Sequence, residues 1–141
     1  MKRTASAVWN GAIMDGKGTI STQSGVLKDA QYSFATRFEN GIGTNPEELL
    51  GAAHAGCFSM ALSGVFGSQN ITPEKISTTA TVSIEKEGEG FSITTVHLDV
   101  SVKASGLDQA KFEELAAIAK ETCPLSKVLK AKITMTAKLG A

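Results

Sequence analysis

GTNPEELLGAAHAGCFSMALSGVFG, from Gly43 to Gly67, is the stretch that decides the fold of this chain. It begins with signals that start a helix, because Thr44 or Asn45 can cap it and Pro46 suits the first helical position. After an acidic first turn nearly every residue is apolar or small, so the predicted helix has almost no polar face. Such a helix must be covered on all sides, and we expect a sheet, other helices or a second subunit to cover it.

The overall composition is that of an ordinary globular protein. The chain has 141 residues, of which 42% are hydrophobic and 20% charged, and 14 basic residues balance 14 acidic ones. This length predicts a single domain over residues 1–141. The charge balance gives no electrostatic reason to expect nucleic acid or an anionic membrane as a partner. The first residues lack the apolar core of a signal peptide, and polar and glycine residues interrupt the apolar helix, so we expect a cytoplasmic protein.

Alternating patterns predict strands on both sides of the long helix. An edge strand is expected at Thr4–Trp9, and residues 31–38 are expected to form a strand that turns Arg37 away from Tyr32 and Phe34. Residues 76–86 and 91–103 predict a long hairpin, with a phase slip near Thr94 that suits a β-bulge. Shorter or later strands are predicted at residues 18–21 and 131–139.

Two further helices are predicted after the hairpin. Asp108 can cap the first of them, and Pro124 suits the first position of the second. Together these elements predict an α+β fold in which antiparallel sheets pack around a central buried helix.

Cys57 lies in the middle of the long helix. Buried thiols are usually inert, since burial raises a thiol pKa and a mid-helix position gains little from the helix dipole. A reactive Cys57 therefore needs a cation to hold its thiolate. His54 lies three residues earlier on the same helical face, and a Cys–His dyad would indicate acyl-transfer chemistry. The alternative is that His54 is an ordinary core or interface histidine.

Arg37 is the other candidate cation. It is one of only two arginines in the chain, and a guanidinium stays charged at any physiological pH while presenting a rigid fork of donors. The alternative is a solvated strand residue. Glu47 and Glu48 suit the positive end of the helix dipole as ordinary first-turn acids, or one of them holds Arg37 in place.

Cys123 differs from Cys57 in its surroundings. It directly precedes Pro124, where backbone N–H groups and the dipole of a starting helix favour a thiolate, so it is either an exchanging thiol or a buried one. Two distant cysteines do not make a secreted disulfide framework. With two histidines and no C-x-x-C pair, we expect no metal site.

Three motifs together carry a family resemblance. GTNPEELLGAAHAGCFSMAL at residues 43–62, the preceding ATRFE and the later CPLSKVLKAKITM resemble the OsmC (osmotically inducible protein C) family, which is related to the organic hydroperoxide resistance proteins. The resemblance runs nearly end to end and includes GKGTISTQSGVL near the start. The position of Arg37 upstream of GTNPEE, and His54 before the cysteine, are similar to the OsmC branch.

The resemblance implies an activity and a set of site residues. It implies a thiol peroxidase of oxidative and osmotic stress defence that reduces organic hydroperoxides, and hydrogen peroxide less efficiently. Cys57 would be the peroxidatic thiolate, Cys123 the resolving thiol that closes a disulfide, Arg37 the stabilising cation and Glu47 its partner. It also implies an intertwined homodimer with shared sites, no prosthetic cofactor and an external dithiol reductant, often lipoyl-linked.

Helix geometry bears on the dimer. Glu47 and Cys57 are ten residues apart, which is about 15 Å along a straight helix, so they cannot share one small site within one unbroken helix. We therefore expect Glu47, and Arg37 with it, to reach Cys57 of the partner subunit. Two other functions remain open on the sequence: a Cys57–His54 hydrolase, and an apolar-ligand-binding or structural module with incidental thiols.

Overall fold

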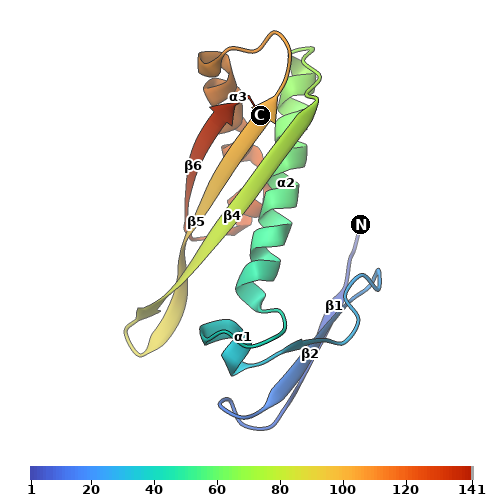
Figure 1. The fold of residues 1–141 in the computed structure, drawn as a ribbon, viewed down its shortest axis with the longest axis vertical. Coiled ribbons are helices and arrows are strands. Elements are labelled where there is room, and N and C mark those ends of the chain that lie inside the picture. Colours follow the sequence, from blue (N-terminus) through green and yellow to red (C-terminus); the bar gives the residue numbers. More distant parts are fainter. Residues whose placement is uncertain (141) are drawn as a thin grey trace. The chain divides into compact units, whose positions relative to one another are not determined.

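A computed structural model describes residues 1–140 and has the α+β architecture expected (Figure 1). Its elements follow in the order β1 (Ala5–Asn10), β2 (Lys17–Thr22), β3 (Ala30–Tyr32), α1 (Phe34–Phe38), α2 (Pro46–Ser68), β4 (Lys75–Glu87), β5 (Gly90–Lys103), α3 (Gln109–Thr122), α4 (Pro124–Val128) and β6 (Lys132–Leu139). The described chain divides into two compact units, Met1–Leu49 and a second that begins at Leu50. The single domain over residues 1–141 stays a prediction.

The first unit is built on a three-stranded antiparallel sheet in the order β1–β2–β3. The connection from α1 to α2 returns to this sheet, because the Thr44 N–H donates to the Gln31 carbonyl at 2.9 Å. Gly43 precedes this contact with a φ of +140°, a backbone conformation that residues with a side chain rarely adopt. The loop therefore depends on glycine at this point.

The strand expected at residues 31–38 is wrong beyond Tyr32. Ser33 ends β3 and caps the short helix α1, because its Oγ accepts from the Thr36 N–H at 3.3 Å while the Thr36 Oγ1 accepts from the Ser33 N–H at 2.8 Å. This reciprocal pair is a capping box, and it outweighs the alternating pattern of the side chains. Arg37 is consequently a helix residue, and it does not face away from Tyr32.

The second unit is built on a three-stranded sheet in the order β4–β5–β6. β4 and β5 form the predicted antiparallel hairpin, and the register shift between Ser83 and Ile84 is the expected bulge, with Thr94 as the extra residue on β5. β5 and β6 are parallel, which corrects the prediction of purely antiparallel sheets. The chain crosses over through α3 and α4 between these strands, and a crossover returns the second strand in the same direction as the first.

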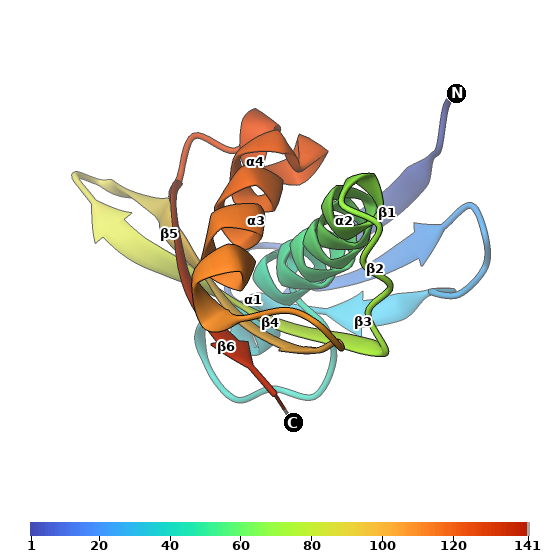
Figure 2. The ribbon, with the colours of Figure 1, turned by 90° about the horizontal axis from the view of Figure 1, so that it is seen from above.

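The core of the second unit lies between one face of this sheet and two helices, α2 and α3 (Figure 2). Alternate residues of β5, from Val96 to Val102, are almost fully buried there. Phe66 of α2 and Phe112 of α3 meet in this layer with their ring centroids 6.3 Å apart. The sheet and both helices thus supply one continuous apolar core.

Within the chain, α2 is covered on one side only. Gly51, His54, Phe58, Leu62 and Phe66 are buried and recur every three or four residues, as one helical face does. The opposite face is open, and its residues are as apolar or small as the buried ones. Met60 on that face is 79% exposed, and a Cβ built at Gly56, Gly64 or Gly67 meets nothing within 4 Å.

The sheet and α3 therefore supply the cover expected for one side of α2, and cover of its other side stays a prediction. By length and composition, α2 is also long and apolar enough to cross a membrane, a property that it shares with core helices of soluble proteins.

Replacing Gly43 by alanine should destabilise the protein. The new Cβ would lie 2.4 Å from the Gln31 carbonyl oxygen in a backbone conformation unfavourable for alanine, and we expect a loss of about 1–3 kcal/mol in the free energy of unfolding. Urea unfolding followed by circular dichroism measures it. Gly90→Ala is the control, because a Cβ there meets nothing within 4 Å. Equal urea midpoints for the two variants would contradict the assignment.

Candidate active site

The two cysteines meet in the second unit. Cys57 is half-buried at the start of the fourth turn of α2, and Cys123 is fully buried between the end of α3 and the start of α4. The Cys123 N–H donates to the Ala119 carbonyl at 2.9 Å, which fixes its backbone at the end of α3. Both residues are free thiols, and the Cys123 Sγ donates to the Cys57 Sγ across 3.1 Å. A pair this close can close into a disulfide with a small movement.

The surroundings of Cys57 act on its acidity in opposite directions. Burial raises the pKa of the Cys57 thiol above its ordinary value, and this effect is the largest. The Leu125 backbone N–H, at the start of α4, donates to the sulfur and lowers the pKa, while the contact with Cys123 raises it. None of these groups of the second unit is a cation. A thiol in this setting needs an additional positive charge to be a thiolate at neutral pH.

The hydrogen-bond partner of His54 is Ser126 and not Cys57. His54 is 0% exposed, and its Nε2 lies 2.8 Å from the Ser126 Oγ on α4. Burial lowers the pKa of the His54 imidazole below its ordinary value, so the ring is neutral near pH 7. Among the described residues, its Nδ1 has no hydrogen-bond partner. This geometry is that of a buried neutral histidine bonded to a serine, and it does not favour a Cys57–His54 dyad.

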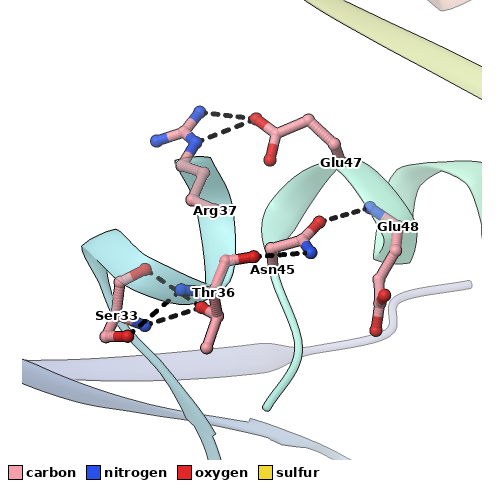
Figure 3. Close-up of polar contacts among 6 residues, drawn as sticks. All are labelled: Ser33, Thr36, Arg37, Asn45, Glu47 and Glu48. Atoms are coloured by element: carbon pink, nitrogen blue, oxygen red, sulfur yellow. Dashed lines mark hydrogen bonds and ion pairs between the residues drawn. The ribbon is translucent and has the colours of Figure 1, made fainter. Parts of the chain in front are cut away.

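Arg37 and Glu47 form an ion pair in the first unit (Figure 3). The Glu47 Oε1 accepts from the Arg37 Nε at 2.9 Å and from the Nη2 at 2.8 Å. Glu47 is buried, whereas 39% of the Arg37 side chain is exposed. The second carboxylate oxygen, Oε2, is buried and has no partner within the described chain. The pair thus presents an oriented guanidinium with further N–H groups to spare.

Asn45 joins the helices that carry this pair. Its Oδ1 accepts from the Glu48 N–H at 2.8 Å and so caps α2, while its Nδ2 donates to the Thr36 carbonyl of α1 at 3.0 Å (Figure 3). One side chain therefore ties the helix of Arg37 to the helix of Glu47. The sequence predicted the capping role of Asn45 but carried no signal for the second bond.

An aromatic cavity of about 250 Å³ lies beside Arg37 in the first unit. The Arg37 guanidinium carbon lies 5.5 Å from the centre of the Phe38 ring, and the Trp9 and Tyr32 rings are also 5.5 Å apart. The residues lining the cavity include Trp9, Ile13, Tyr32, Phe34, Arg37 and Phe38. An apolar ligand with one group that accepts hydrogen bonds would suit this arrangement.

Over residues 1–140, no group of three or more His, Cys, Asp or Glu side chains is arranged to hold a metal ion. The reactive and charged groups that the two sites present are two thiols, a guanidinium and the carboxylate that holds it. The predicted residues fall into two sets, Cys57 with Cys123 and Arg37 with Glu47, and each set is brought together within its own unit.

Comparison with known proteins connects these residues to a family. The family described as OsmC-like protein matches residues 39–138. Peroxiredoxin OsmC of Escherichia coli is 51% identical over 137 residues, which cover 97% of this chain and 96% of that protein. Organic hydroperoxide resistance protein OhrB of Bacillus subtilis is 32% identical over 123 residues, or 86% of this chain and 88% of that protein.

Solved structures agree with the sequence matches. The crystal structure of Bacillus subtilis OhrB superposes with a TM-score of 0.69 at 30% identity, over 97% of this chain and 98% of that one. A structure from Legionella pneumophila, described as an organic hydroperoxide resistance protein OsmC, has a TM-score of 0.68 at 28% identity, over 98% of this chain and 97% of that one.

Changing Asn45 to aspartate should separate its two bonds. Aspartate keeps the oxygen that caps α2, so we expect the free energy of unfolding to fall by less than about 1 kcal/mol. It loses the donor to the Thr36 carbonyl, so α1 and Arg37 should loosen. The Arg37 Nε–H resonance, one of only two from arginines, should lose its protection from solvent exchange in NMR spectra.

The matched control for this prediction is Thr44→Val. It removes the neighbouring bond from the Thr44 Oγ1 to the Glu48 Oε2 at 2.8 Å but leaves the Asn45 bridge in place. The Arg37 resonance should stay protected. Full protection in Asn45→Asp would show that the bridge does not hold Arg37.

Proposed function

Because the chain belongs to the OsmC-like protein family, we propose that it is a thiol-dependent peroxidase that reduces organic hydroperoxides to alcohols in stress defence. The observation that carries the proposal is the 3.1 Å contact between the free thiols of Cys57 and Cys123. The names of the relatives, a peroxiredoxin and organic hydroperoxide resistance proteins, support the same reaction. Sulfur itself carries the oxidation, so this chemistry needs no prosthetic group.

In the first step the Cys57 thiolate attacks the outer oxygen of the hydroperoxide. The O–O bond breaks, an S–O bond forms, and the alkoxide takes a proton and leaves as alcohol. Cys57 is oxidised to a sulfenic acid and the peroxide is reduced. Arg37 donates hydrogen bonds to the oxygen on which charge develops, and Glu47 orients the guanidinium.

In the second step Cys123 resolves the intermediate. Its thiol attacks the Cys57 sulfenic acid, an S–S bond forms, and the hydroxyl leaves as water. An external dithiol, of the lipoyl-linked kind, then reduces the disulfide by thiol exchange and restores both thiols. The half-buried Cys57 and the fully buried Cys123 suit a bond that is closed inside the protein and reopened by a specific reductant.

Arg37 and Glu47 act on Cys57 of the partner subunit. Burial raises the Cys57 pKa, so the thiolate needs a cation, and Arg37 is the arginine held by a buried acid. Since α2 is one unbroken helix from Pro46 to Ser68, ten residues advance about 15 Å along it. Glu47 and Cys57 of one chain therefore serve different sites.

The open face of α2 supports the homodimer. It carries no polar stripe, Met60 on it is 79% exposed, and a Cβ built at Gly56 or Gly64 meets nothing within 4 Å. A second copy would bury this face, and the glycines would let the two helices approach closely. The dimer would thereby complete both the core and the active sites.

Bulky organic hydroperoxides are the favoured substrates. The aromatic cavity beside Arg37 can take the organic group while the guanidinium holds the peroxide oxygens. Hydrogen peroxide has no organic group to pack in this cavity, so it is reduced less efficiently. We place the reaction in the cytoplasm, where a reduced dithiol pool keeps both cysteines free between turnovers.

One equivalent of cumene hydroperoxide should convert the reduced protein to the Cys57–Cys123 disulfide. Because water leaves when the disulfide closes, non-reducing mass spectrometry should show the loss of two hydrogens. Peptide mapping should place the bond between Cys57 and Cys123. An unchanged mass would count against the peroxidase and in favour of a binding module with incidental thiols.

The two cysteine variants give the controls for this experiment. Cys57→Ser should lower peroxide consumption to the uncatalysed level, while Cys123→Ser should consume one equivalent and stop at the sulfenic acid, which dimedone traps. Wild-type turnover in Cys57→Ser would refute the mechanism.

Heterodimers should reveal which subunit supplies Arg37. A dimer of one Cys57→Ser chain and one Arg37→Met chain has Cys57 of the second chain facing Arg37 of the first, so it should keep roughly half of the wild-type activity, since one of two sites is intact. This heterodimer is obtained by co-expressing the two chains with different tags and purifying over both tags. Both parent homodimers should be inactive.

The matched control places both substitutions on one chain beside a wild-type partner. If Arg37 acts across the interface, neither site of this dimer is complete and activity is lost. If Arg37 acts within its own chain, the wild-type chain keeps its site and the outcomes of the two heterodimers are reversed.

A further inference from the structure

Three contacts tie the start of α4 to the middle of α2. The Cys123 Sγ lies 3.1 Å from the Cys57 Sγ, and the Leu125 N–H donates to the same Cys57 sulfur. The third contact joins the His54 Nε2 to the Ser126 Oγ at 2.8 Å. The first two contacts change as soon as Cys57 is oxidised, because they involve its sulfur. Of the three, the contact of His54 with Ser126 is the one that does not involve the reacting sulfur.

The helix held by this contact, α4, is too short to be stable on its own. α4 has five residues, and Cys123 at its N-cap provides no side-chain hydrogen bond to cap it. Isolated helices of this length are unstable, so its position is set by the groups around it. Leu125 and Leu129 pack against the core of the second unit, but apolar contacts allow sliding that a directional hydrogen bond does not.

Histidine is an energetically unfavourable residue at the buried position 54. His54 is 0% exposed, and its Nδ1 has no partner among the described residues. A buried ring nitrogen without a partner has lost its hydrogen bonds to water, a penalty that a leucine in the same place would not carry. The hydrogen bond of the His54 Nε2 reaches α4, which directly follows Cys123, and this points to a role beyond packing.

We propose that His54 is a positioning residue for the resolving step: through Ser126 it holds α4, and thereby the Cys123 thiol, against the Cys57 sulfenic acid. This inference rests on the proposed peroxidase function. The step it assists joins the two sulfurs and releases water, and His54 touches neither sulfur. Its contribution is the effective concentration of the Cys123 thiol at the intermediate, which depends steeply on distance.

The test compares the two steps in one reaction. In His54→Leu and in Ser126→Ala, peroxide consumption in the first turnover should stay within about twofold of wild type, while disulfide formation should slow roughly ten- to a hundredfold. Quenched-flow alkylation followed by mass spectrometry measures both. The longer-lived sulfenic acid should meet a second peroxide, so excess cumene hydroperoxide should give more Cys57 sulfinic acid than in wild type.

Two further variants separate positioning from general stability. Ser59→Ala removes another hydrogen bond of α2, the 2.7 Å contact between the Ser59 Oγ and the Thr78 Oγ1, and should leave the rate of disulfide formation unchanged. Ser126→Thr keeps the hydroxyl and should restore most of the rate lost in Ser126→Ala. If His54→Leu fails to fold, Ser126→Ala carries the test, because Ser126 is only half-buried.

The outcomes are distinguishable. Wild-type disulfide rates in Ser126→Ala would overturn the inference and leave the peroxidase intact, as would an equal slowing of both steps. Absence of any disulfide in wild type would instead refute the proposed function itself.

Discussion

The rigidity of α2 is the constraint on which the rest of the structure depends. An α-helix fixes the spacing of its residues, so the backbone positions of Glu47 in its first turn and Cys57 at the start of its fourth turn are about 15 Å apart along its axis. The same helix has no polar face, and within the chain only one side of it meets the sheet and α3. Both properties are the reasons for the proposed homodimer, in which a second copy would complete the chemistry and cover the helix.

The electrostatics of the thiols follow from this arrangement. A sulfur on a core helix is deprived of water, and burial raises the Cys57 pKa. One backbone N–H from α4 offsets part of that effect, but a thiolate at neutral pH needs a full charge. The guanidinium of Arg37 keeps its charge at any physiological pH, and a buried acid fixes its direction. In the proposed dimer, the catalytic thiol and the cation that activates it are carried by separate rigid elements and meet on assembly.

Sequence reasoning succeeded where local chemistry decides. Asn45 with Pro46, Asp108 and Pro124 each marked the start of a helix, because capping oxygens and a fixed proline φ act within one turn. The hairpin of β4 and β5 and its bulge followed from the alternation of side chains. The strand predicted over residues 33–38 was wrong because Ser33 and Thr36 form a capping box, which the alternation of side chains does not reveal. The parallel direction of β6 depends on the crossover and was equally hidden.

For the site, the sequence reached the residues but not their arrangement. Physics alone left Cys57 as an inert core thiol or a nucleophile, and only the family pattern paired it with Cys123. The 3.1 Å contact between them depends on how α3 and α4 return to α2, which no local rule predicts. Ser126 was missed for the same reason, since a serine in a short helix has many possible partners and its bond to His54 is set by tertiary packing.

The choice of a neutral contact at this point is itself consistent with the chemistry. An ion pair between α2 and α4 would hold the helices as firmly, but its charges would lie one turn from Cys57 and would change the thiol pKa and the reactivity of the sulfenic acid. A neutral imidazole bonded to a hydroxyl supplies direction without charge. Burial lowers the pKa of the imidazole and keeps the ring neutral, so in the proposed mechanism His54 positions the resolving thiol without adding a charge beside the attacking sulfur. Under that proposal position is set by His54 and charge by Arg37, and each can be altered without the other.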